Sequence, residues 1–139
     1  MKLGGLSGIL LVCAAAGIGC QKDQMSPVRA DVLAEGTRVF QERCSPCHGE
    51  GGRGNGPLAD VLAIRPRNYH RDEFKWGTRP SEIAATVRGG RSGVMPGFEG
   101  VLSERQIQSV AYFVWLMLPE ERRMQEARGA VQPAAPESP

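Results

Sequence analysis

Residues 44–48 read Cys-Ser-Pro-Cys-His, and the interpretation of the whole chain starts from this stretch. The C-x-x-C-H spacing is the attachment signature of a c-type haem, in which two cysteine thiols add across the two vinyl groups of one porphyrin. Cys44 and Cys47 have the spacing that spans a single haem edge, and His48 follows directly, where its ring can reach the iron as the proximal ligand. A haem fixed in this way does not require a deep pocket, so a small domain can hold it near its surface.

The same thiol spacing is also used in structural zinc sites and in thioredoxin-like redox sites. Structural zinc needs a second pair of ligands, but Cys13 and Cys20 fall in or beside the N-terminal apolar stretch, and His70 stands alone. A thioredoxin-like site needs βαβ surroundings, and the chain shows no such pattern. The sequence therefore favours the haem over both alternatives.

Residues 1–19 are predicted to be an export signal. Lys2 supplies one positive charge, and residues 3–18 are uncharged, apolar and rich in Gly and Ala. This stretch is short for a membrane span and has the character of a secretory signal.

Gly19-Cys20 at the end of the apolar stretch resembles a bacterial lipobox, although Gly17 stands where leucine is usual. Under this interpretation Cys20 becomes a lipidated N-terminus and anchors the protein to the membrane. The alternatives are cleavage near residues 14–16, which would leave a soluble periplasmic protein, and an uncleaved anchor. All of them place the domain outside the cytoplasm, on the periplasmic side of a bacterial inner membrane.

The formal net charge is +2 at pH 7, so the whole molecule lacks the strong field of a nucleic-acid-binding protein. One segment is nevertheless basic, and its charge is opposed by Asp72 and Glu73 alone. It is either a solvated loop or a docking patch for an acidic partner, and it contains Arg65, Arg67, Arg71, Lys75 and Arg79.

The pattern of apolar residues predicts helices separated by long loops. A tether is expected at 20–29 and the main domain at 30–119, followed by a charged helix and a disordered Pro/Ala-rich tail at 120–139. Ser103 to Gln106 form a capping box that opens the strongest helix. The predicted helices span 30–43, 58–64, 81–88, 103–118 and 120–128, and the glycine-rich loop begins at Gly49.

Met95 is the candidate for the second axial ligand. It lies in a loop just after a predicted helix end, and Pro96 restricts its backbone to an extended conformation. The alternatives are that Met95 only fills a pocket, or that His70 is the ligand. The remaining methionines have core or polar surroundings: Met25, Met117 and Met124.

Taken together, these features resemble the class I c-type cytochromes, the family of mitochondrial cytochrome c and its small bacterial relatives. The resemblance covers about residues 32–118: Gly36 and Phe40 on the first helix, the haem motif, Gly56-Pro57-Leu58, Met95-Pro96, and an aromatic last helix. It implies an all-α cytochrome c fold, with a few helices and long loops wrapped around one covalently bound haem. No internal repeat is present, in keeping with one haem.

The resemblance also implies particular contacts. The first and last helices should cross at Gly36, with Phe40 packing near Tyr112 or Trp115. The carbonyl of Pro57 should accept a hydrogen bond from the His48 ring, which would orient the ring.

The stretch 65–69, followed by 74–76, is similar to a bacterial branch of single-haem cytochromes, several of which serve respiratory chains. In that branch, aromatic and basic residues of this loop hold the haem propionates. Arg67, Tyr69 and Trp76 are the corresponding candidates here, and packing against the porphyrin edge is their alternative role.

The leading expectation is a one-electron carrier, and not an enzyme, with its iron held by His48 and Met95. Its partners would be a membrane-bound reductase or dehydrogenase as donor and a terminal oxidase as acceptor. One alternative is a gas-binding or peroxide-reactive haem protein, sensor or enzyme, which requires a labile Met95. Another is a fixed cytochrome subunit of a larger redox complex, with the segment beyond Pro119 as a docking element.

Overall fold

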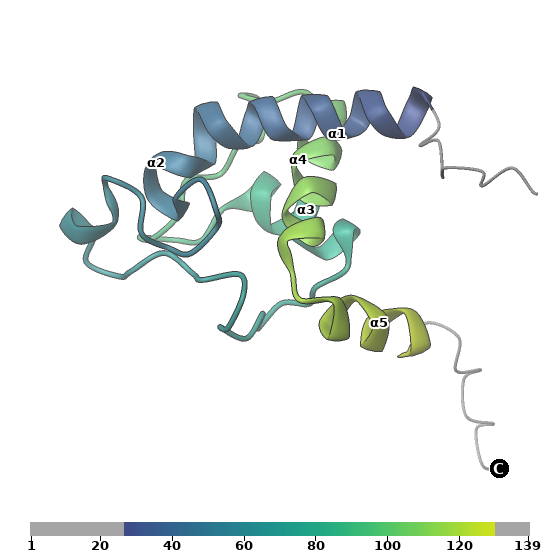
Figure 1. Ribbon diagram of the computed structural model, residues 1–139. Coiled ribbons are helices and arrows are strands. Elements are labelled where there is room, and N and C mark those ends of the chain that lie inside the picture. The colour runs from purple at the N-terminus through teal and green to yellow at the C-terminus, as the bar shows by residue number, and fades with distance from the viewer. Residues whose placement is uncertain (1–26, 130–139) are drawn as a thin grey trace, which may run out of the picture.

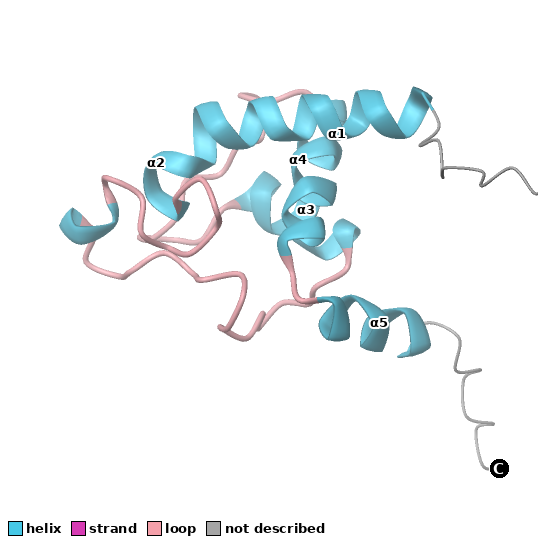
Figure 2. Ribbon diagram, in the orientation of Figure 1, coloured by secondary structure: helices cyan, strands magenta, loops and turns pink. Residues whose placement is uncertain are grey.

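The computed structural model describes residues 27–129, and this part of the chain consists of helices joined by loops, without a β-strand (Figures 1 and 2). The all-α prediction is confirmed. The predicted signal, Cys20 and the tail beyond 129 lie outside the described residues. The helices are α1 (Pro27–Val39), the π-helical η1 (Phe40–Cys44), α2 (Ser45–His48), the 3-10 turn η2 (Ala59–Val61), α3 (Pro80–Gly89), α4 (Glu104–Met117) and α5 (Glu120–Gly129).

Helix α1 begins at Pro27, ahead of the expected start at Ala30, so its first turn takes up the end of the predicted tether. Proline suits the first position of a helix because its missing N–H has no intrahelical partner there. At its other end α1 continues through η1 directly into α2, as Figure 1 shows. The C-x-x-C-H motif therefore lies at the C-terminal end of one continuous helical segment.

Helices α1 and α4 pack directly on each other at Gly36. A Cβ atom at Gly36 would lie well inside 3.0 Å of the Ser109 carbonyl oxygen, so glycine is required for this approach. Phe40 is fully buried beside the crossing, with its ring centroid 5.2 Å from that of Phe113.

The predicted partners of Phe40, Tyr112 and Trp115, stack on each other instead, with ring centroids 5.7 Å apart. Phe113 replaces them because it lies four residues after Ser109, on the face of α4 that meets α1. The helix crossing is as expected, and the aromatic partner differs by one position along α4.

Helix α3 covers a second side of α4 through its buried residues Ile83, Ala84 and Val87. The predicted capping box at the start of α4 is present, since the Ser103 hydroxyl accepts from the Gln106 backbone N–H and the Gln106 side chain accepts from the Ser103 N–H. None of the helices within residues 27–129 is long and apolar enough to cross a membrane.

The segment between α2 and α3 is mostly loop, as predicted, and the helix expected at 58–64 is reduced to the single turn η2. Helix α5 is present where a charged helix was expected. It is tied to this long loop by Arg122, whose guanidinium donates to the backbone carbonyls of Asp72 at 2.5 Å and Arg71 at 2.8 Å. The loop is thus held between α2, α3 and α5.

Candidate functional site

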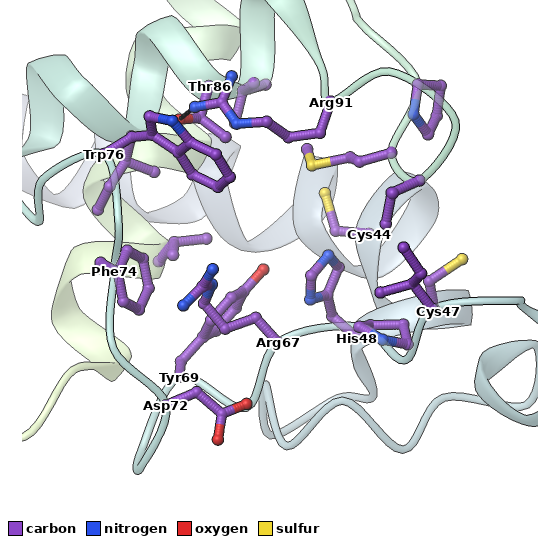
Figure 3. Close-up of a pocket in the computed structure, with 18 of the residues that line it drawn as sticks. Cys44, Cys47, His48, Arg67, Tyr69, Asp72, Phe74, Trp76, Thr86 and Arg91 are labelled. Carbon is purple, nitrogen blue, oxygen red and sulfur yellow. Dashed lines mark hydrogen bonds between the residues drawn. The ribbon is translucent and has the colours of Figure 1, made fainter.

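A cavity of about 470 Å³ lies between the C-x-x-C-H motif, the long loop, α3 and the loop after α3 (Figure 3). Its volume falls within the usual range for sites that bind small molecules and cofactors. Apart from Pro57, every residue predicted for the site lines it: Cys44, Cys47, His48, Arg67, Tyr69, Trp76 and Met95.

The two motif cysteines sit at one end of the cavity with His48 (Figure 3). Neither forms a disulfide, so both thiols are available for covalent attachment. Burial raises the pKa of Cys44 to about 12, and the neighbouring Cys47 contributes to the rise. The Cys44 thiol is therefore protonated at neutral pH, which is typical of a thiol in apolar surroundings.

The His48 ring faces the cavity (Figure 3) and stacks on the Tyr69 ring, with centroids 5.0 Å apart and an interplanar angle of 23°. Burial lowers the pKa of His48, and the backbone of Arg67 opposes this effect. The neutral imidazole is thus favoured, which is the form that binds iron. Its Nδ1 atom is buried without a partner in hydrogen-bond geometry among the described residues.

The expected hydrogen bond from His48 to Pro57 is not formed. The glycine-rich loop folds back on the motif, where the N–H groups of Gly54 and Gly56 donate to the carbonyls of His48 and Cys47. This fold places Pro57 against the outer side of the motif, away from the cavity. Arg67 is instead the residue whose backbone affects the ring, because the chain before it, at Pro66, packs on Gly54.

Met95 is the one methionine among the residues that line the cavity in the described part of the chain. Its loop is held by paired backbone hydrogen bonds, from Arg91 N–H to Met95 O at 2.8 Å and from Met95 N–H to Arg91 O at 2.9 Å. Gly90, with φ of 65°, lets the end of α3 pack directly against this loop. The thioether is therefore presented from a well-braced segment.

The other candidates for a second ligand lie elsewhere. His70 is exposed, and its Nε2 atom lies 2.7 Å from the carbonyl of Gly51, which ties two loops together outside the cavity. Met117 packs beside Gly52 and Tyr69 and does not line the cavity, and Met124 is 53% exposed. Met25 lies outside the described residues. Across residues 27–129 no three side chains among His, Cys, Asp and Glu gather to hold a metal ion.

The basic segment is less positive than its composition predicts, because much of its charge is paired. Arg65 bonds Asp60 at 2.7 Å, Arg71 bonds Asp72 at 3.2 Å, and Arg79 pairs with Glu82. Arg67 extends into the cavity over the Phe74 ring, with its guanidinium carbon 5.3 Å from the ring centroid. These ion pairs weaken the hypothesis of a docking patch.

Arg91 is the main residue of the site that sequence reasoning missed. It lines the cavity beside Trp76 (Figure 3), and its guanidinium carbon lies 4.1 Å from the centroid of the Trp76 ring. The sequence places Arg91 directly after the Gly-Gly that ends α3. The signal is weak, because nothing in the sequence says that this helix end meets Trp76, fifteen positions earlier in the chain.

Residues 31–114 match the family model described as "Cytochrome C oxidase, cbb3-type, subunit III". The chain belongs to this family of c-type cytochromes. Membership implies a covalently bound haem c, in agreement with the cofactor predicted from the motif. The cavity of this cytochrome fits such a group, since it brings together two unpaired thiols, a buried imidazole nitrogen without a partner and a thioether.

Two curated relatives illustrate the similarity. The cytochrome is 33% identical over 81 residues to the cbb3-type cytochrome c oxidase subunit FixP of Bradyrhizobium diazoefficiens, covering 58% of this chain and 26% of that one. It is 36% identical over 85 residues to the subunit CcoP of Cereibacter sphaeroides, covering 61% of this chain and 27% of that one. The chain thus spans about a quarter of the length of these relatives.

Among solved structures, the cytochrome is similar to a chain of the reducing HAO-like protein complex of Kuenenia stuttgartiensis. The TM-score is 0.60 at 26% identity, and the match covers 64% of this chain and 44% of the other. The similarity agrees with an all-α cytochrome fold.

Proposed function

We propose that this cytochrome transfers single electrons through one haem c bound by Cys44 and Cys47, with His48 and Met95 as the axial ligands. The observation that carries the proposal is the meeting of the C-x-x-C-H motif and Met95 at one largely apolar cavity. When bound, haem c supplies reversible one-electron chemistry, and Met/His ligation gives it a higher potential than ligation by two histidines.

The protein's own contribution is to fix the positions of both ligands. Stacking on Tyr69 sets the plane of the His48 ring, and burial keeps that ring neutral. The paired hydrogen bonds between Arg91 and Met95 limit the movement of the thioether. Ligands that stay in place in both oxidation states suit electron transfer, because little geometry has to change.

We further propose that the domain works as a cytochrome subunit of a larger membrane redox complex of the terminal-oxidase kind. The support is the naming of its relatives as oxidase subunits. A free carrier tethered through a lipidated Cys20 on the periplasmic side is the second candidate, and the lipobox-like sequence favours it. In either role the donor and acceptor are redox proteins, with a terminal oxidase on the acceptor side.

The test of ligation is an optical spectrum of the exported protein, oxidised and reduced, with and without carbon monoxide. We expect a low-spin spectrum, the weak near-infrared sulfur-to-iron band in the ferric form, and little reaction with carbon monoxide. Met95→Ala should bind carbon monoxide readily, whereas Met117→Ala, which removes a thioether outside the cavity, should not. A parent protein that binds carbon monoxide as fast as Met95→Ala would overturn the carrier proposal in favour of a gas-binding haem.

The test of the subunit role is co-purification after mild detergent extraction of membranes from the native host. A subunit should elute with a terminal oxidase in constant proportion through two different chromatographic steps. A lipid-tethered carrier should separate from it at moderate salt, because the remaining contacts are weak and screened.

A further inference from the structure

The guanidinium group of Arg91 lies in the wall of a mostly apolar cavity, where its neighbours are uncharged groups. Its Nη2 atom donates to the Thr86 hydroxyl at 2.5 Å and its Nη1 atom to the carbonyl of Gly90 at 2.8 Å. The indole face of Trp76 lies 4.1 Å from the guanidinium carbon. The Nε atom is buried and has no hydrogen-bond partner among the described residues.

The described residues give Arg91 no carboxylate. Ion pairs in this part of the chain occupy other arginines, such as Arg88, which bonds Glu104 at 2.7 Å from the same helix as Thr86. A half-buried guanidinium without a counter-charge is unfavourable, because neutral partners replace only part of its hydration. The guanidinium of Arg91 would therefore be stabilised by an anion bound in the cavity.

The geometry points to a carboxylate site: we propose that Arg91, held by Thr86 and Trp76, binds a propionate carboxylate of the haem. This inference rests on the proposed function, because the ligand is the propionate of the haem that Cys44 and Cys47 would attach. An arginine fork matches the two oxygens of a carboxylate, and an aromatic face holds the fork flat. The cavity wall at Arg91 supplies both features.

Arg91 is better suited to this role than Arg67, the candidate chosen from the sequence. Arg67 lies within the field of Asp72, and its charge contributes to lowering the pKa of that carboxyl group. The positive charge of Arg67 is therefore partly compensated by the carboxylate of Asp72. Arg91 is also joined to Met95 by two backbone hydrogen bonds, so one short segment presents both the axial thioether and the carboxylate partner.

The test compares the reduction potential of the holoprotein at pH 8 with that of Arg91→Gln. Loss of a positive charge beside the haem disfavours the reduced form, so the equilibrium constant for reduction should fall about tenfold, which is about 59 mV for one electron. Arg88→Gln is the matched control, because it removes the same charge three residues earlier, in the last turn of α3 and outside the cavity, and should shift the potential much less. Resonance Raman spectra would report the propionate bending band of each variant.

Arg91→Lys separates a binding role from a structural one and provides a measurement if Arg91→Gln fails to accumulate. It keeps the charge, so the potential should stay near that of the parent, while the propionate band should shift because the two-point hydrogen bond is lost. A potential in Arg91→Gln that moves no more than in Arg88→Gln, or a propionate band unchanged in both Arg91 variants, would overturn the inference alone. A parent that carries no covalent haem would overturn the proposed function, and this inference with it.

Discussion

Replacing Gly36 with alanine tests whether the close approach of α1 and α4 sets the shape of the site. The added Cβ would lie inside 3.0 Å of the Ser109 carbonyl oxygen and 3.0 Å from Phe113 Cβ, where ordinary contact begins at 3.4 Å. The nearest obstacle is the backbone of a buried helix, so relief requires the two helices to move apart. Such overpacking typically costs 1–3 kcal/mol, and alanine returns roughly 0.5–1 kcal/mol through its better helix propensity.

We therefore expect Gly36→Ala to destabilise the holoprotein by about 1 kcal/mol, or about 4–8 °C in Tm for a domain of this size. The assay is thermal and chemical unfolding followed by circular dichroism at 222 nm. Val110 and Val114 of α4 line the cavity, so carbon monoxide binding should also become faster as α4 shifts.

Gly89→Ala is the matched control for this experiment. Like Gly36, Gly89 is a helical glycine without positive φ, but it is the last residue of α3 and a Cβ there meets nothing within 4 Å. Its replacement should leave stability unchanged or raise it by about 0.5 kcal/mol, since the unfolded chain loses freedom. Equal stability of Gly36→Ala and Gly89→Ala would refute the argument that the helix crossing is rigid and close.

Three further outcomes are expected. Cys44→Ala combined with Cys47→Ala should abolish covalent haem, and haem stain on a denaturing gel of that variant would rule out the motif as the attachment site. Arg122→Gln removes the donors that tie α5 to the turn at Asn68–Asp72, so amide hydrogen exchange in that turn should become about tenfold faster; an unchanged rate would show that α5 does not brace the loop. Cys20→Ser should move the protein from the membrane fraction to the soluble periplasm, and continued membrane association would contradict the lipid anchor.

Features that depend on local sequence were predictable here. The capping box at Ser103 fixes the start of α4 through hydrogen bonds within four residues. Gly36 and Phe40 share a helix face by their spacing, and the resemblance to class I cytochromes added that this face meets the last helix. Met95 could be singled out because proline and glycine around it restrict the backbone in a way that is visible in the sequence.

Features that depend on where two loops meet were not predictable. Pro57 was expected at the His48 ring, but backbone hydrogen bonding in the glycine-rich loop turns it outward, and the backbone of Arg67 is the one that affects the ring. Arg91 was overlooked because its partners Trp76 and Thr86 come from a loop and a helix whose relative placement no local pattern encodes. Three-dimensional contacts of this kind depend on how the chain closes around the cavity.

The size of the cavity indicates that the stability of the fold depends on haem attachment. The wall of the cavity is mostly apolar, so without a ligand it exposes apolar surface to water at a cost of about 25 cal/mol per Å². Small domains are stable by only about 5–15 kcal/mol, so losing the contacts between the haem and this wall would remove a large share of the stability of the native packing. It follows that Cys44→Ala with Cys47→Ala should lose cooperative unfolding as well as haem. The two thioether bonds that attach the redox-active haem would then also stabilise the native packing of the polypeptide.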